Sequence, residues 1–481
     1  MHKATPEVSA ARRRPFLDGL QDPTAVTALL HQTFRWLLAA ALIIVACFWP
    51  SSMPPTTFLL GGIQVNEPDH SAWVDALTGV GMNAVPVTVY AKQGDWDSDN
   101  LWFDKEAPSV VSEIRKAKAG GLKVVLILRV ALDHAFERNR FLWHGMIMPR
   151  DEAALRSWFE KYTAFVAKWA RISQQEGVDV LGISSEMNAL TDTIPRSDEA
   201  ILKELKDLRY WHTHYKERVM AFDKDIAAGH LWDPSHHGNQ SLPDHLDDRA
   251  EANLTWLEQT FFGGQDQGAA KVQKRRDQLE AGWRQVIDAA REHYQGPLTY
   301  ASNFDSYQKV AFWDALDVMG VNAYFKLRQR FDEPLGDDQM LGRFTLQWHK
   351  IFGDIEDFRG QHELATKPLL FTELGYTFRK NATFEPWSYT RFSIIEWGQS
   401  DPPQRQLVVW PEQPIDYRER RVAIDALHDA TDWSHRAYFK GILYWKFSTN
   451  PDHADIEPFV MHVGPQSSDI LQASLLRFLD R

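Results

Sequence analysis

The chain has 481 residues, of which 44% are hydrophobic and 25% are charged, a composition that favours a folded protein with a sizeable core over a disordered one. Its net charge of -12 gives no basic surface for a nucleic acid partner, and the one notable basic cluster is Arg12 to Arg14. The single cysteine, Cys47, rules out an internal disulfide and a multi-cysteine zinc site.

An uncharged apolar run, WLLAAALIIVACFW, occupies residues 36–49 and follows several arginines, the last of which is Arg35. It is shorter than the roughly 20 residues that span a bilayer, but its neighbours can extend it. We predict a cytoplasmic tail over residues 1–35 and a membrane anchor with linker over residues 36–57, which would leave the remaining chain on the periplasmic or extracellular side. Because the residues before Cys47 resemble a lipobox, a secreted protein or a lipoprotein is the alternative.

From residue 58 to residue 481, short β-rich runs alternate with helical patterns, which is typical of βαβ units and a parallel sheet. The eight expected strands are Leu59–Asn66, Ala84–Ala91, Lys123–Leu132, Asp179–Asn188, Gly296–Asn303, Val318–Phe325, Lys367–Tyr376 and Phe439–Ser448. No glycine-rich phosphate loop follows the first strand. The pattern therefore predicts an α/β fold of the (β/α)8 TIM barrel type and not an open doubly wound sheet.

The clearest helix lies between the third and fourth expected strands, where apolar residues recur at a spacing of three and four. These residues are Leu155, Trp158, Phe159, Tyr162, Phe165, Val166, Trp169 and Ile172. The segment of about 189–268 is too long for a βα loop, and we predict that it forms an enlarged region over the active-site mouth. Its histidines, His230, His236, His237 and His245, do not predict a metal site, and we expect neither a metal nor a cofactor.

Barrel enzymes place their reactive side chains at the C-terminal ends of the strands. Glu186 and Glu373 follow the apolar runs of the fourth and seventh expected strands. Burial of a carboxylate is costly unless it has a task or a partner. Two acids facing each other across a barrel mouth suit glycosidic bond cleavage, in which one protonates the leaving oxygen and the other attacks the sugar. The alternative is a structural role, in which these acids pair with Arg129 or another inward base.

The motifs ISSEMNALT around Glu186, LLFTELGY around Glu373 and ILYWKFS around Trp445 resemble those of clan A glycoside hydrolases. Over residues 59–450 the chain is most similar to the family-113 barrels, known chiefly as β-mannanases. The resemblance implies that Glu186 is the general acid/base of a retaining enzyme and Glu373 its nucleophile. It also implies that Tyr324 hydrogen-bonds the nucleophile and that Trp445 forms the floor under the attacked sugar.

Many clan members carry Asn immediately before the acid, where this chain has Ser185. Other polar residues at or near the strand ends are candidates for substrate contact. These residues are Arg129, Asn188, Asn303, Asn322, Asn66 and His134.

Two other functions compete with a glycoside hydrolase. Metal-dependent hydrolases of this fold need a histidine pair at the end of the first strand, where the chain reads Gln64-Val65-Asn66. A glycan-binding barrel without turnover is the second alternative, and the two retained glutamates argue against it. The expected substrate is a β-linked polysaccharide, either β-mannan or an envelope polymer or exopolysaccharide. For a retaining enzyme we expect the two carboxyl groups roughly 5 to 5.5 Å apart, with Glu186 protonated and Glu373 charged.

Overall fold

The computed structural model describes residues 57–213 except 104 and 106, residue 234, residues 239–263, 268–387 except 331 and 332, 392–397, 404–409, and 414–480 except 432–434, 436, 465 and 466. The chain divides into two compact units, Met1–Ser51 and Ser52–Arg481, and all described residues belong to the second. The expected tail and apolar run therefore lie outside the described residues. Among the helices that are described, none has the length and apolar character needed to cross a membrane.

All eight expected strands are present, and four of them end two or three residues earlier than the sequence predicts. They are β1 (Leu59–Gln64), β2 (Ala84–Gln93), β4 (Lys123–Leu132), β5 (Val180–Ser185), β6 (Leu298–Asn303), β7 (Val318–Asn322), β8 (Leu369–Leu374) and β11 (Phe439–Ser448). They form one parallel sheet in the order β1-β11-β8-β7-β6-β5-β4-β2. The order follows the chain, as expected for successive βαβ units.

The sheet is curled, and its two ends approach each other. The Asn83 amide donates to the Leu60 carbonyl at 3.2 Å, and the Leu60 amide donates to Asn83 Oδ1 at 2.8 Å. A side chain at Gly61 would lie 2.0 Å from the Ala84 carbonyl oxygen, so only glycine permits this approach. The curled parallel sheet is consistent with the expected TIM barrel.

The inside of the curled sheet is filled by an apolar cluster to which every one of the eight strands contributes, as a barrel interior requires. The cluster consists of Leu59, Ala84, Val125, Ile127, Val180, Ala301, Val318, Leu370 and Leu443. A larger apolar layer lies between the sheet and the helices. Because this cluster fills the interior, a functional site is expected among the side chains at the C-terminal ends of the strands.

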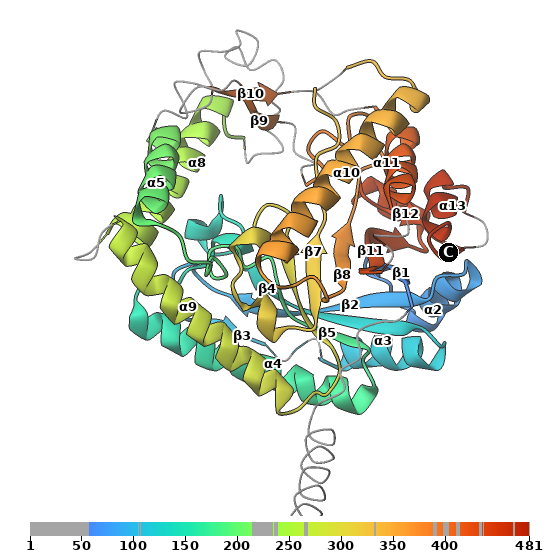
Figure 1. Ribbon diagram of the computed structural model, residues 1–481, viewed down its shortest axis with the longest axis horizontal. Coiled ribbons are helices and arrows are strands. Elements are labelled where there is room, and N and C mark those ends of the chain that lie inside the picture. Colours follow the sequence, from blue (N-terminus) through green and yellow to red (C-terminus); the bar gives the residue numbers. More distant parts are fainter. Residues whose placement is uncertain are drawn as a thin grey trace, which may run out of the picture. The chain divides into compact units, whose positions relative to one another are not determined.

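Helices cover the outside of the sheet (Figure 1). They are α2 (His70–Gly79), α3 (Ala107–Ala119), α4 (Glu152–Glu176), α9 (Gly268–Arg291), α10 (Asp337–Gln361), α11 (Tyr417–Ala430) and α13 (Ile470–Leu476). α4 is the helix expected from the apolar spacing, and all its predicted core residues are buried except Ile172, which is half-buried. Asp151 caps its N-terminus by accepting from the Ala154 amide, and Gly177 ends it at a φ of 68°.

The segment after β5 contains helices where the sequence predicts only an enlarged loop region. α5 (Asp198–Thr213), α8 (Leu242–Leu257) and the π-helical turn η5 (Glu258–Phe262) lie at the upper left of Figure 1. With the start of α9 they enclose a separate small core. This core consists of Ile201, Leu205, Leu257, Ala269 and Val272.

Several short elements were not expected from the sequence. The strands are β3 (Leu101–Trp102), β12 (Met461–His462) and an antiparallel pair, β9 (Phe392–Trp397) and β10 (Gln404–Val409). The 3-10 turns are η2 (Glu137–Asn139), η3 (His144–Met146), η6 (Tyr307–Lys309), η7 (Phe312–Ala315) and η8 (Pro451–Asp455). Of these, η3 and η6 matter for the site, because they follow β4 and β6 on the C-terminal side of the sheet.

Candidate active site

Glu373 lies on β8 and is held by two side chains from neighbouring strands. Its side chain is only 3% exposed. Arg129 of β4 donates to Oε1 and forms a buried ion pair with the carboxylate, and the Tyr324 hydroxyl, just after β7, donates to Oε2 at 2.7 Å. Burial raises the pKa of Glu373, while the charge of Arg129 and the hydrogen bond from Tyr324 oppose that rise. The pKa of Tyr324 is raised by its own burial, so it stays protonated and can donate.

Glu186 follows β5 and contacts a histidine that the sequence analysis does not single out. Nε2 of His144, in η3, lies 3.1 Å from Glu186 Oε2. Burial opposes ionisation of Glu186, but the hydrogen bond and charge of His144, the charge of Arg129 and a hydrogen bond from Asn322 together lower its pKa. Glu186 also has a φ of 53°, and residues in such rarely populated conformations cluster at functional sites.

The two glutamates influence each other electrostatically, since the negative charge of Glu186 raises the pKa of Glu373. The direction differs from the one expected from the sequence, which gave Glu186 the raised pKa. At Glu186 the effects of His144, Arg129 and Asn322 outweigh that of burial, whereas at Glu373 burial and the charge of Glu186 outweigh the effects of Arg129 and Tyr324. Glu186 is therefore the more readily ionised of the two acids.

Trp445, on β11, belongs to the same group of side chains. The guanidinium carbon of Arg129 lies 5.2 Å from the centroid of the indole, and Lys446 Nζ lies 4.2 Å from it. The indole is half-buried, so part of its surface remains open to a ligand. The fold thus brings together Arg129, Tyr324, Glu373 and Trp445 as four of the residues that the sequence predicts.

Asn322 connects the two residues that directly precede the glutamates. Its Nδ2 donates to Ser185 Oγ at 3.3 Å, and its Oδ1 accepts from the Thr372 hydroxyl at 2.8 Å. Ser185 and Thr372 directly precede Glu186 and Glu373 in the sequence, and all three polar side chains are buried. The amide therefore links the ends of β5, β7 and β8.

The remaining predicted residues lie in different settings. Asn303 Oδ1 accepts from the Phe304 amide and stabilises the turn after β6, and Asn66, after β1, is exposed. His134 is exposed, and its Nε2 lies 3.0 Å from the Leu142 carbonyl oxygen within its own loop. In this loop it is His144 that reaches a glutamate.

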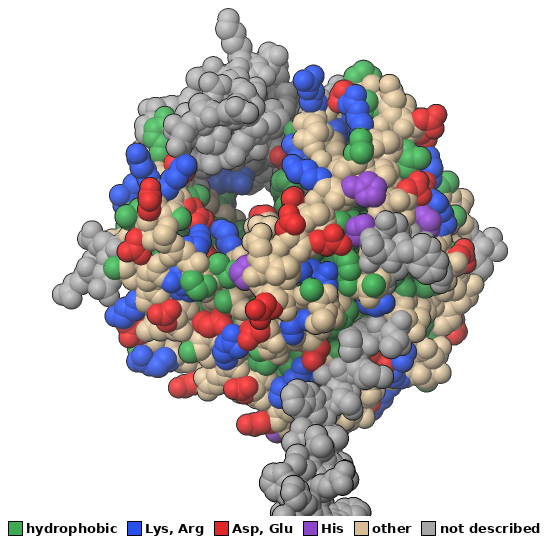
Figure 2. Space-filling view, viewed as in Figure 1, with side chains coloured by type: hydrophobic (Ala, Val, Ile, Leu, Met, Phe, Trp, Pro, Cys, Tyr) green, Lys and Arg blue, Asp and Glu red, His purple; other side chains and the backbone are tan. Residues whose placement is uncertain are grey.

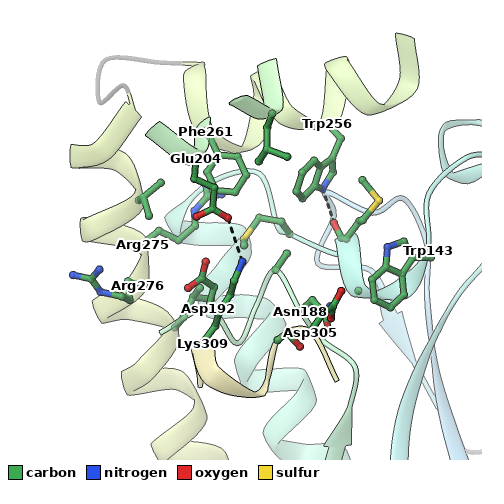
Figure 3. Close-up of a pocket in the computed structure, with 18 of the residues that line it drawn as sticks. Trp143, Asn188, Asp192, Glu204, Trp256, Phe261, Arg275, Arg276, Asp305 and Lys309 are labelled. Atoms are coloured by element: carbon green, nitrogen blue, oxygen red, sulfur yellow. Dashed lines mark hydrogen bonds and ion pairs between the residues drawn. The ribbon is translucent and has the colours of Figure 1, made fainter. Parts of the chain in front are cut away.

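Asn188, two residues after Glu186, lines a pocket of about 390 Å³ (Figure 3). Asp305, which the sequence analysis also misses, lies against the Asn188 amide at the base of this pocket. Burial raises the pKa of Asp305. No sequence pattern distinguishes Asp305 or His144, because both lie in irregular segments after strand ends.

The face shown in Figure 2 carries interspersed acidic and basic side chains. It is hollowed between the side of α5 and α8 and the side of α10. In the part of the chain that the structure describes, no three His, Cys, Asp or Glu side chains are arranged to hold a metal ion.

The chain is similar to known glycoside hydrolases in both sequence and fold. The sequence model of Glycoside Hydrolase Family 113 matches residues 64–226 and 269–400. The chain resembles the solved structure of the GH113 β-mannanase AaManA from Alicyclobacillus acidocaldarius, described in complex with ManMIm, with a TM-score of 0.54 and 16% identity over 88% of this chain and 97% of that one. A complex structure of a GH113 β-1,4-mannanase gives a TM-score of 0.53 and 14% identity over 88% and 99% of the two chains. A comparison with curated protein sequences finds no match.

Proposed function

Since the chain belongs to glycoside hydrolase family 113, we propose that it is a retaining enzyme that cleaves a β-linked, mannan-like polysaccharide by double displacement. In this proposal the curled sheet is a closed (β/α)8 barrel, Glu373 is the nucleophile and Glu186 is the general acid/base. The observation that carries the proposal is the pair of glutamates in contrasting surroundings, with Arg129 and Tyr324 on one and His144 on the other. The similar solved structures, described as β-mannanases, make β-mannan the first substrate to test.

In the first step the Glu373 carboxylate attacks the anomeric carbon. Arg129 favours the charged form of the buried carboxylate, and the bonds of Arg129 to Oε1 and of Tyr324 to Oε2 fix the orientation of the carboxylate for attack. Glu186 must be protonated to donate to the leaving oxygen. A sugar bound over Glu186 removes its remaining exposure of 13%, which raises its pKa toward the protonated form.

In the second step Glu373 is neutral and Glu186 carries the negative charge. When Glu373 becomes a neutral glycosyl ester, the positive charge of Arg129 is no longer balanced by that carboxylate. Arg129 already lowers the pKa of Glu186, and its effect then increases. Glu186 is left as a carboxylate that removes a proton from the incoming water, which completes hydrolysis with retained configuration.

The proposed roles of Glu373 and Glu186 can be tested with one variant of each glutamate. Glu373→Ala should abolish turnover of all substrates, because no other group can form the covalent intermediate. Glu186→Ala should still attack an activated aryl β-mannoside, and azide should restore its turnover and give a β-mannosyl azide. Loss of azide rescue, or an α-azide, would contradict the assignment of Glu186.

A glycan-binding barrel without turnover remains the competing function, because Ser185 departs from the Asn of many clan members. The domain from residue 58 onward should be assayed for reducing sugars on mannan, glucomannan, cellulose, xylan and mixed-linkage glucan. Release from mannan or glucomannan supports the enzyme, whereas affinity without product on every glycan supports the binding protein.

We also propose that the apolar run of residues 36–49 tethers the protein with its barrel on the periplasmic or extracellular side, where an envelope polymer or exopolysaccharide is a further candidate substrate. The support is the sequence alone, with arginines on the N-terminal side of the run. Alkaline phosphatase fused to the C-terminus should be active. A fusion that is active only with a cytoplasmic reporter would refute this orientation.

A further inference from the structure

The residue after Glu186, Met187, has both of its backbone polar groups bonded to the same pair of hydroxyl groups. The Met187 amide donates to the Tyr300 hydroxyl at 3.0 Å, and the Thr191 hydroxyl donates to the Met187 carbonyl at 3.1 Å. The two hydroxyl oxygens lie 3.1 Å apart. Because the hydrogen of Thr191 is used for the carbonyl, the hydrogen of Tyr300 is donated to the Thr191 oxygen. These bonds form a closed ring around Met187.

The ring of hydrogen bonds is buried and firmly anchored. Met187, Thr191 and Tyr300 are all buried, so a substrate reaches none of them. Burial and, to a smaller degree, the nearby charge of Glu186 raise the pKa of Tyr300, so its hydroxyl stays protonated. A buried group that loses its partner cannot turn to solvent, so each bond of the ring is costly to remove.

The Tyr300 side chain is fixed by its aromatic neighbours. Tyr300 lies on β6, and its ring centroid is 6.1 Å from that of Trp283 on α9. It is 5.8 Å from the centroid of Phe312 and 6.0 Å from that of Trp313, both in η7. The hydroxyl is therefore held at one place relative to β5.

The backbone of Glu186 needs such support, because its φ of 53° is rarely adopted by residues other than glycine. A conformation of this kind persists only where the surrounding structure fixes it. The Glu186 amide donates to the Ala301 carbonyl at 2.9 Å, and the next amide, that of Met187, donates to Tyr300. Two successive residues of β6 thus fix the peptide groups on both sides of the glutamate.

We propose that Tyr300, with Thr191, is a positioning residue that keeps Glu186 in the conformation from which it protonates the leaving oxygen. The inference rests on the proposed function, because it takes Glu186 as the acid/base. General acid catalysis contributes about 10²- to 10⁴-fold and requires the acid within hydrogen-bond reach of the oxygen. Glu373 is held by Arg129 and Tyr324, so its attack does not depend on the ring.

The test removes single hydroxyl groups and leaves both glutamates in place. Tyr300→Phe takes away the acceptor of the Met187 amide, and Thr191→Val opens the ring on its other side. Tyr162→Phe is the matched control, because the Tyr162 hydroxyl is equally buried and donates to the Ile183 carbonyl of β5 at 2.8 Å, before Glu186 in the strand. Thermal unfolding checks that each variant is folded.

Each variant is assayed on two substrates that differ in their need for an acid. The leaving sugar of β-1,4-mannopentaose must be protonated, whereas the dinitrophenolate of 2,4-dinitrophenyl β-mannobioside departs without a proton. For both substrates kcat/KM reports the first step, in which the glycosidic bond is cleaved. The ratio of the two values therefore measures acid catalysis separately from the attack of Glu373.

For Tyr300→Phe, kcat/KM on mannopentaose should fall about 10- to 100-fold, while kcat/KM on the aryl mannobioside stays within about 2-fold of the original. Thr191→Val should show a loss in the same direction, of at least about 3-fold, because the Met187 carbonyl keeps its bonds from the Leu190 and Thr191 amides. Tyr162→Phe should change both values by the same factor. If one ring variant does not fold, the other decides.

Equal losses on both substrates, no loss on mannopentaose, or a loss confined to mannopentaose in Tyr162→Phe as well would overturn the role of Tyr300. Each of these results would leave the proposed function intact. If the unaltered enzyme hydrolyses neither substrate, the proposed function fails and this inference fails with it.

Discussion

Arg129→Met provides a quantitative test of how the site holds Glu373, the proposed nucleophile. The variant keeps most of the side-chain volume and leaves the Glu373 carboxylate buried with Tyr324 as its remaining donor. Removal of one partner from a buried ion pair costs about 3 to 5 kcal/mol, so the free energy of unfolding at pH 8 should fall by about that amount. Arg129 and Glu373 are 7% and 3% exposed, so solvent screens this pair little.

The loss should depend on pH with a defined sign. Because burial already raises the pKa of Glu373 in the folded state, removal of Arg129 raises it further. The folded variant then binds more protons than the unfolded chain, so its stability rises as the pH falls toward the unfolded pKa. Urea unfolding at pH 5 and pH 8 should show a smaller deficit at pH 5, and Glu373→Gln in the same chain should remove most of the deficit at pH 8. Equal deficits at both pH values, or an Arg129→Met variant with full activity, would refute the reasoning.

Three further predictions concern single residues. Trp445→Ala should reduce turnover far more than stability, as measured by kcat/KM beside thermal unfolding, and an unfolded variant would mean that the indole is only packing. His144→Ala should raise the pKa of Glu186 and move the alkaline limb of the pH profile of kcat/KM to higher pH; a shift to lower pH would exclude this role. Burial raises the pKa of Glu113 to about 7, so its contribution to stability is lost as the pH rises from about 4.5 through 7. Glu113→Gln should therefore be more stable than the original protein at pH 8, by roughly 3 kcal/mol in urea unfolding, with little gain at pH 4.5, and equal stability at pH 8 would contradict this.

The strands and the side chains around Glu373 could be predicted because each rests on a local pattern. Each of the eight strands is an apolar run whose end is polar, and the ends of β4, β7, β8 and β11 supply Arg129, Tyr324, Glu373 and Trp445. Once parallel strands are arranged around one sheet, their C-terminal ends must meet at one side. The proximity of these four residues could therefore be predicted without knowing the conformation of any loop.

The surroundings of Glu186 could not be predicted in the same way. His144 lies 42 residues before Glu186, and its position depends on η3, whose Met146 carbonyl is held by Trp256 of α8, 110 residues further along the chain. Such contacts between irregular segments leave no periodic signal. For this reason no sequence pattern points to His144, and the pKa of Glu186 is lowered where the sequence leads one to expect a raised value.

The most direct test of the central claim is to trap the covalent intermediate. Incubation with 2,4-dinitrophenyl 2-deoxy-2-fluoro-β-mannoside should inactivate the enzyme with release of one dinitrophenolate, because the fluorine slows hydrolysis of the glycosyl ester more than its formation. Proteolysis and mass spectrometry should then find the fluoromannosyl group on the peptide that contains Glu373, and Glu373→Gln should form no adduct. An adduct on Glu186 or on any other residue, or turnover of mannan with inverted configuration, would contradict the account.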